Sequence, residues 1–156
     1  MFALPALLIA LQEEMRMPLA PGEGPVALVL CPSRELAAQS AEIVQDYCAD
    51  LRKGGFPELR SLLCIGGLDG RAMGDLIASR GVHLCVATPG RLKDLLKRRK
   101  MNLDACRYLC LDEADRMVDL GFEEEVSDLW QKDGRSKQTT AAAALGARTP
   151  PLLLPF

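Results

Sequence analysis

The chain has 156 residues, of which 49% are hydrophobic, so it can form one buried core but is too short for two full domains. It carries 19 basic and 21 acidic residues, which gives a net charge of −2. This balance excludes a globally basic surface, so any nucleic-acid contact must come from locally placed arginine and lysine side chains.

The apolar start of the chain, residues 1–11, predicts a core helix. It resembles the apolar region of a signal peptide, but no basic flank precedes it, it contains Pro5, and it runs directly into Gln12-Glu13-Glu14. No stretch reaches the roughly 18 uninterrupted apolar residues that a membrane-spanning helix needs. We therefore expect a soluble protein without a membrane partner.

Four short apolar runs without alternation predict strands that are buried on both faces. They are residues 26–31, 60–65, 82–87 and 108–111. Helical patterns lie between them, at 34–51 with Ser33 as the capping residue, at 69–79 and at 91–97. Strands that alternate with helices predict an α/β fold with a doubly wound parallel sheet.

The cysteine and histidine residues are interpreted as structural. No pair of cysteines has C-x-x-C spacing, and free cysteine behaves as a small buried hydrophobe, so we expect core positions and a reducing intracellular compartment. The lone His83 is predicted to be a strand residue that points away from the core and has no chemical role. The six cysteines are Cys31, Cys48, Cys64, Cys85, Cys106 and Cys110.

Polar and glycine-rich segments follow all four predicted strands. They read Pro32-Ser33-Arg34-Glu35, Gly66-Gly67, Thr88-Pro89-Gly90-Arg91 and Asp112-Glu113-Ala114-Asp115. Ligands bind at the carboxyl ends of parallel strands, where hydroxyls and helix-start amides suit phosphate oxygens, glycines permit close approach and arginines add charge. The first three segments predict a grip on a phosphodiester backbone. The alternative is that serine, glycine and proline are simply turn residues, which explains any single loop better than the gathering of all four.

The acidic string that begins at Asp112 follows a predicted strand directly, where a nucleotide-bound metal would lie. Magnesium on a triphosphate needs hard oxygen ligands, usually through its own waters, and hydrolysis needs a second carboxylate that orients the attacking water. Asp112 and Glu113 are candidates for these two roles. The alternative interpretation is a solvated acidic turn.

Together, these segments resemble the first RecA-like domain of the DEAD-box RNA helicases, which are P-loop NTPases. The resemblance rests on Pro32-Ser33-Arg34-Glu35-Leu36-Ala37, Gly66-Gly67, Ala87-Thr88-Pro89-Gly90-Arg91 and Leu111-Asp112-Glu113-Ala114-Asp115-Arg116-Met117, in that order. Their surroundings, such as Leu63-Cys64-Ile65 and Gly81-Val82-His83, are similar to the Abstrakt-type branch. The resemblance covers residues 1 to about 130.

The resemblance implies ATP and Mg²⁺ as cofactors and RNA as a partner. It implies that Asp112 orders the magnesium through water, that Glu113 positions or activates the water that attacks the γ-phosphate, and that Asp115 couples the site to a later motif. It also implies a second RecA-like domain, ribonucleoprotein assemblies and location in the nucleus, with the cytoplasm as a second compartment. The residues that it implies hold one RNA strand by its sugar-phosphate backbone are Pro32, Ser33, Arg34, Glu35, Gly66, Gly67, Thr88, Pro89, Gly90 and Arg91.

Two departures from the family pattern limit the expected activity. The sequence has no G-x-x-x-x-G-K-[ST] phosphate-binding loop, so residues 1–131 are interpreted as a partial helicase ATP-binding domain. Residues 132–156 lack the family's Ser-Ala-Thr motif. Because residues 149–156 are too interrupted by proline for a strand or helix, we predict that 132–156 form a disordered or irregular tail. We expect negligible ATPase activity from this chain alone.

Three functional hypotheses follow. The first is a fragment of an ATP-dependent RNA helicase, in which ATP hydrolysis is coupled to opening of an RNA duplex. The second is a short isoform that binds RNA or a partner without turnover. The third is a truncated product with no function of its own. The basic cluster at 97–100 fits a nuclear import signal, an RNA contact or a solvated helix end.

Overall fold

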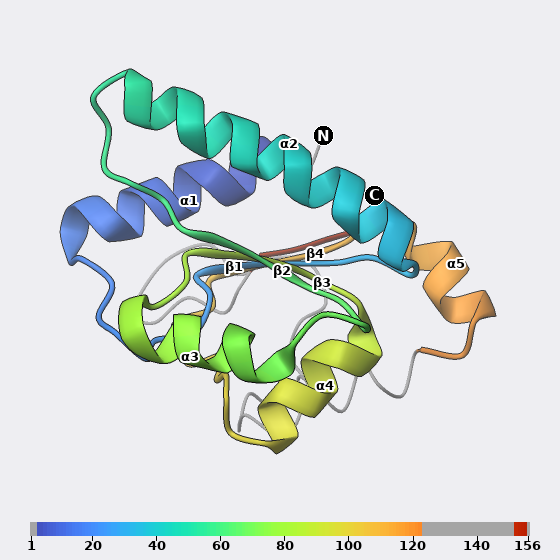
Figure 1. Cartoon of the computed structure of the whole chain (residues 1–156). Coiled ribbons are helices and arrows are strands. Elements are labelled where there is room, and N and C mark those ends of the chain that lie inside the picture. Colours follow the sequence, from blue (N-terminus) through green and yellow to red (C-terminus); the bar gives the residue numbers. More distant parts are fainter. Residues whose placement is uncertain (1–2, 123–151, 156) are drawn as a thin grey trace.

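The computed structural model describes residues 3–122 and the backbone of a strand at 152–155 (Figure 1). Five parallel strands form one sheet in the order β2-β3-β1-β4-β5. The strands are β1 (Ala27–Leu30), β2 (Ser61–Cys64), β3 (Leu84–Ala87), β4 (Tyr108–Leu111) and β5 (Leu152–Pro155). The predicted α/β fold with a parallel sheet is confirmed.

Helices cover both faces of the sheet. Figure 1 shows α1 (Ala3–Arg16) and α2 (Arg34–Lys53) on one face, and α3 (Gly70–Arg80) and α4 (Pro89–Lys97) on the other. Each face has its own cluster of buried apolar side chains, so the sheet is a shared layer between two cores. The short helix α5 (Ala114–Asp119) follows β4 at the carboxyl end of the sheet.

The register of the central strands brings the strand ends to one level. Leu30, the last residue of β1, pairs with Ala87 of β3 and with Leu111 of β4. All four residues of β1 and of β3 are buried, which is why these runs show no polar alternation in the sequence. The loops that follow the strands therefore emerge together at a single edge.

The predicted helix at 34–51 is confirmed as α2. Ser33 has an extended backbone, and its hydroxyl accepts a hydrogen bond from the Leu36 amide at 3.2 Å, as an N-cap residue does. Arg52 and Lys53 lie in the last turn, where positive charge complements the helix dipole.

The prediction that His83 points away from the core is wrong. Its side chain is fully buried, its Nδ1 accepts a hydrogen bond from the Arg60 amide at 3.0 Å, and its Nε2 lies 2.8 Å from Oε2 of Glu14. The sequence pattern could not show this arrangement because Glu14 lies 69 positions earlier in the chain. A buried polar ring is stable only with such partners.

The prediction that the tail is too interrupted by proline to supply a strand is wrong for residues 152–155. These residues form β5, which pairs with β4 in parallel register, with Leu111 opposite Pro155. Proline is tolerated on an edge strand because its missing amide can face away from the ladder. The rest of the predicted disordered tail, 132–151 and residue 156, lies outside the described residues.

All six cysteines are free and buried, which confirms their interpretation as core residues. Residues 3–122 contain no group of three or more histidine, cysteine, aspartate or glutamate side chains that could together hold a metal ion. Within the same range, no helix combines the length and the apolar character that a bilayer crossing requires.

Candidate nucleic-acid interface

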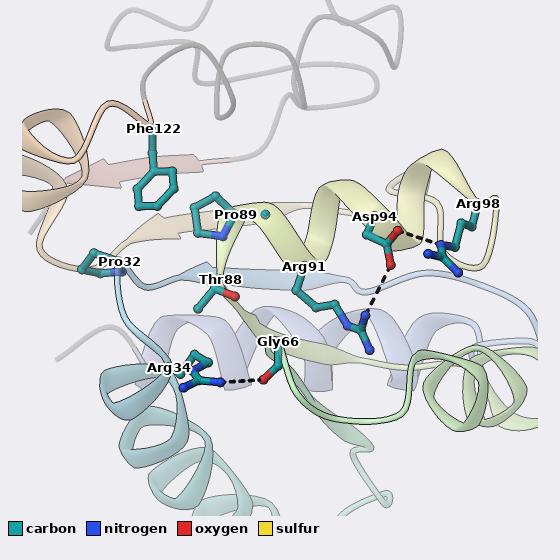
Figure 2. A pocket seen from close by; sticks show the side chains of 10 residues that line it. Pro32, Arg34, Gly66, Thr88, Pro89, Arg91, Asp94, Arg98 and Phe122 are labelled. Carbon is teal, nitrogen blue, oxygen red and sulfur yellow. Dashed lines mark hydrogen bonds and ion pairs between the residues drawn. The ribbon is translucent and has the colours of Figure 1, made fainter.

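A groove of about 530 Å³ opens at the carboxyl ends of the strands (Figure 2). It collects residues from the loops that follow β1, β2 and β3, together with side chains of α4. Seven of the ten residues predicted to bind RNA line it. The lining residues are Pro32, Arg34, Gly66, Thr88, Pro89, Gly90, Arg91, Asp94, Arg98 and Phe122.

The other three predicted residues, Ser33, Glu35 and Gly67, lie beside the groove rather than in its lining. The Ser33 hydroxyl is engaged as the cap of α2, and Glu35 is exposed in the first turn of that helix. Gly67 has a φ of +92°, so its turn requires a conformation that side chains disfavour. Ser33 and Gly67 therefore shape the loops that carry the lining residues.

Two arginines approach the loop after β2 from different helices. Nη1 of Arg34 donates to the carbonyl oxygen of Gly66 at 3.4 Å, and Nη2 of Arg91 donates to the carbonyl oxygen of Leu68. Figure 2 shows both side chains extending toward this loop. Because each guanidinium is tied to a backbone carbonyl, both positive charges occupy defined positions in the groove.

Asp94 forms ion pairs with two arginines, Arg91 in the first turn of α4 and Arg98 at its C-cap. Its Oδ2 lies 3.3 Å from Nη1 of Arg91, and its Oδ1 lies 2.7 Å from Nε of Arg98. Sequence analysis missed Asp94, although its spacings of three and four residues from the two arginines are those of helical ion pairs. Arg98 belongs to the basic cluster at 97–100, whereas Phe122 follows α5 without any sequence signal.

Two glycines in the groove are not required by the protein's own packing. A Cβ atom at Gly90 would meet nothing within 4 Å, and one at Gly66 would meet only Cδ of Arg34 at 4.0 Å. Neither residue has a positive φ. The space above these backbones is therefore open, as expected where a ligand backbone approaches closely.

Thr88 and Pro89, the N-cap and the first residue of α4, line the groove. Thr88 is the N-cap residue but makes no side-chain capping hydrogen bond, and Pro89 has no amide hydrogen. The N-terminus of this nine-residue helix presents backbone amides and a partial positive charge. This arrangement suits a phosphate oxygen.

The carboxylates of the acidic string lie at the end of β4. The Asp112 amide donates to the Leu30 carbonyl at 2.9 Å, which fixes the residue beside the end of β1. Burial, and then the negative charge of Glu113, raise the pKa of the Asp112 carboxyl. A bound cation would favour its ionised form.

Glu113 has the left-handed backbone conformation, with φ 52° and ψ 53°. This conformation is uncommon for a residue with a side chain and costs roughly 1–3 kcal/mol, which functional sites often retain. The Glu113 carboxylate pairs with Arg116 at 3.2 Å, and Asp115 is exposed in the first turn of α5. The chain turn thus separates the Glu113 carboxylate from the buried sheet.

The donor set fits magnesium. Asp112 and Glu113 supply hard carboxylate oxygens, and with so few ligands the ion would keep most of its waters, as magnesium does. Both carboxylates suit an ion whose other ligands are waters and nucleotide phosphates.

The parallel α/β fold and these strand-end segments are those of the first domain of DEAD-box helicases, and comparison with known proteins agrees on this class. The sequence model of the DEAD/DEAH box helicases matches residues 1–148, and the chain belongs to this family. The resemblance stated from the sequence motifs is confirmed.

Individual relatives are similar over nearly the whole chain. DEAD-box ATP-dependent RNA helicase 35 of Arabidopsis thaliana is 57% identical over 92% of this chain and 24% of its own length. ATP-dependent RNA helicase abstrakt of Drosophila melanogaster is 50% identical over 92% of this chain and 23% of its own length. The chain thus spans about a quarter of the length of these relatives.

The crystal structure of the yeast DEAD-box splicing factor Prp28 has the same fold. It superposes with a TM-score of 0.77 at 29% sequence identity, covering 99% of this chain and 32% of that one.

Proposed function

We propose that the chain forms part of an ATP-dependent RNA helicase and that its groove binds one RNA strand by the sugar-phosphate backbone. The observation that carries the proposal is that loops from three separate strands converge on one groove whose two glycines leave their backbones open. The names of the relatives support ATP and RNA as the ligands.

The chemistry of the lining favours backbone contacts over base contacts. The groove offers the guanidinium groups of Arg34 and Arg91, the hydroxyl of Thr88 and the amides at the start of α4. These groups are donors to phosphate oxygens and carry no sequence information by themselves. We therefore expect binding that depends on salt but is nearly indifferent to RNA sequence.

At the nucleotide end, the proposal assigns Asp112 to hold magnesium through water and Glu113 to orient the attacking water at its carboxylate. Bound magnesium would neutralise charge on the nucleotide phosphates. The partly buried position of Asp112 beside β1 keeps its carboxylate in place, and the turn at Glu113 aims the second carboxylate separately.

RNA binding by the 156-residue chain tests the groove. We expect similar affinity for labelled single strands of different sequence, with a slope of log K against log salt of about −0.7 for each phosphate bound. Arg34→Ala should lower both the affinity and the size of this slope. Arg80→Ala is the matched control, because Arg80 is exposed and pairs with Glu58 away from the groove.

Gly90→Ala tests the close approach specifically. The added methyl group meets no protein atom within 4 Å, so the free energy of unfolding should not fall, whereas a bound strand would be displaced. The proposal fails if Gly90→Ala and Arg34→Ala both bind RNA as the unmodified chain does.

A second candidate function is RNA binding without turnover. The lining residues that the structure describes do not include Asp112 or Glu113, the two residues proposed to act at the nucleotide. Affinity that is unchanged by ATP and magnesium, with no ATP hydrolysis, would favour this candidate. Loss of cooperative unfolding would instead indicate a product with no function of its own.

A further inference from the structure

A second cavity, of about 560 Å³, lies between α3 and α4 and adjoins the groove. Arg91, Asp94 and Arg98 line both spaces. The second cavity also receives Arg71 from the first turn of α3 and Lys100 from the segment after α4. Its volume is within the range of about 300–1,000 Å³ that is typical of ligand sites.

Positive charge in this cavity exceeds negative charge, because four basic side chains face two carboxylates. Both carboxylates are used internally. Asp94 bridges Arg91 and Arg98, and Oδ1 of Asp69 accepts the Arg71 amide at 2.8 Å as the cap of α3. Among the described residues, the Arg71 guanidinium and the Lys100 ammonium form no hydrogen bond or ion pair.

The guanidinium of Arg91 also keeps an unused donor. Its Nη1 and Nη2 bind Asp94 and the Leu68 carbonyl, but its Nε is buried and has no partner among the described residues. Buried donors are almost always paired in folded proteins. An acceptor oxygen from a ligand would satisfy the Nε donor of Arg91.

Two glycines on one face of α3 allow the basic side chains to reach this cavity. A Cβ at Gly70 would lie 2.8 Å from Nη2 of Arg91, and a Cβ at Gly74 would lie 2.9 Å from Cδ of Lys100. The two positions are four residues apart and so share a helix face. Because Gly70 and Gly74 have no side chains, this face of α3 leaves room for Arg91 and for the aliphatic part of Lys100.

We propose that this cavity binds a phosphate of the RNA strand that lies beyond the groove, so that the strand continues between α3 and α4. The inference rests on the proposed function of the groove. The four basic side chains carry only hydrogen-bond donors, and those of Arg71 and Lys100 have no acceptor among the described residues, so the oxygens of a phosphodiester match them. A phosphodiester is favoured over an acidic peptide because the cavity continues a groove whose donors already suit backbone phosphates.

The test compares RNA strands of graded length with the 156-residue chain. Strands long enough to leave the groove should bind more tightly than strands that only fill it. Arg71→Ala and Lys100→Ala should each lower the affinity for long strands about fivefold at 0.1 M salt. Each lost phosphate contact changes the slope of log K against log salt by about 0.7, and about 0.1 M lies one decade below about 1 M, so log K falls by about 0.7. Affinity for the shortest strands should not change.

The controls remove equal charge elsewhere. Arg80→Ala removes an arginine from the other end of α3, and Lys53→Ala removes an exposed lysine that pairs with Asp50 at the end of α2. Neither should alter the dependence of affinity on strand length. Gly74→Ala is an independent variant, because its methyl group displaces Lys100 while alanine favours the helix. This variant should lower the affinity for long strands without lowering the free energy of unfolding.

The outcomes separate this inference from the proposed function. Suppose that Arg34→Ala lowers the affinity for all strands, while Arg71→Ala and Lys100→Ala do not change how affinity depends on strand length. The cavity then does not bind the strand, and the inference is overturned. If no strand binds, the proposed function fails and the inference fails with it.

Two competitors identify the ligand. Inorganic phosphate should reduce the affinity for long strands to that for short ones. If it binds through Arg71 and Lys100 while strand length has no effect, the site takes a free anion, which contradicts the inference. An oligoglutamate peptide that binds through the same two residues more tightly than long RNA would assign the cavity to an acidic protein instead.

Discussion

Nε2 of His83 lies 2.8 Å from Oε2 of Glu14, and this contact joins the end of α1 to the start of β3. Nδ1 of the same ring accepts the Arg60 amide, so the proton must lie on Nε2, which donates to the carboxylate. Oε2 of Glu14 also accepts the Leu19 amide at 2.8 Å. One buried ring thus links α1, the start of β2 and the start of β3.

Replacing this ring should destabilise the fold strongly. His83→Ala leaves a cavity and removes a partner from both the Glu14 carboxylate and the Arg60 amide, so we expect a loss of about 2–4 kcal/mol in urea unfolding. Glu14→Gln keeps an acceptor oxygen and should cost only about 1 kcal/mol. Equal losses of unfolding free energy in the two variants would show that the charge of Glu14, rather than the ring of His83, provides the stabilisation.

The same pair makes stability depend on pH. Burial lowers the pKa of His83 below its ordinary value of 6.5, so the unfolded chain binds a proton more readily than the folded one. The stabilisation is complete above pH 6.5 and is lost as pH falls from there through the lower folded-state pKa. Burial alone would raise the pKa of Glu14, but hydrogen bonds from His83 and Leu19 lower it overall, which adds a further loss below its ordinary 4.5.

Urea unfolding between pH 7 and pH 5, where Glu14 contributes little, measures the histidine contribution. His83→Gln, which has no titrating ring, should show a flatter dependence on pH in this window. A decline in stability as steep as that of the unmodified chain would place the effect on other groups.

His83 also shows why sequence analysis predicts some features and misses others. The strands β1 to β4 and most of the groove follow from local patterns, because each of these strands is a short apolar run and the segments with Pro32, Gly66 and Thr88 directly follow one. The contact between His83 and Glu14, and the addition of β5 beside β4, depend on chain segments far apart in sequence. Asp94 was locally visible through its spacing, but its role required knowing that Arg91 faces the groove.

The cysteines should be inert in the folded chain. Burial raises the pKa of Cys31 to about 12 and those of Cys48 and Cys110 to about 11, so little thiolate exists near neutral pH. We expect an aromatic disulfide reagent to label almost no thiol in the native chain and all six after denaturation. Rapid labelling of one thiol before unfolding would contradict the buried arrangement.

Gly24 is required by close backbone packing. A Cβ at this position would lie 1.7 Å from the carbonyl oxygen of Asn102, and a backbone atom cannot move aside as a flexible side chain can. Gly24→Ala should therefore destabilise the chain by about 3 kcal/mol or more in urea unfolding. Gly90→Ala, where the added methyl meets nothing within 4 Å, is the matched control, and similar losses in both would argue against this packing.

Variants at Glu113 can distinguish a residue kept for function from one kept for stability. Its left-handed backbone is strained for any residue with a side chain, and its carboxylate makes no capping hydrogen bond to α5. Glu113→Gly should therefore be as stable as the unmodified chain, or more stable by about 1 kcal/mol. A loss of stability would show that the side chain supports the turn.

Glu113→Gln completes the comparison, because it keeps both the strain and the side-chain shape while removing the negative charge. In a helicase that contains this domain, both variants should lose ATP hydrolysis, although only Glu113→Gly relieves the strain. Hydrolysis that survives in Glu113→Gln would remove this carboxylate from the proposed mechanism. Loss of hydrolysis without loss of stability would mean that the strain at the end of β4 is retained because the carboxylate must be placed beside the nucleotide.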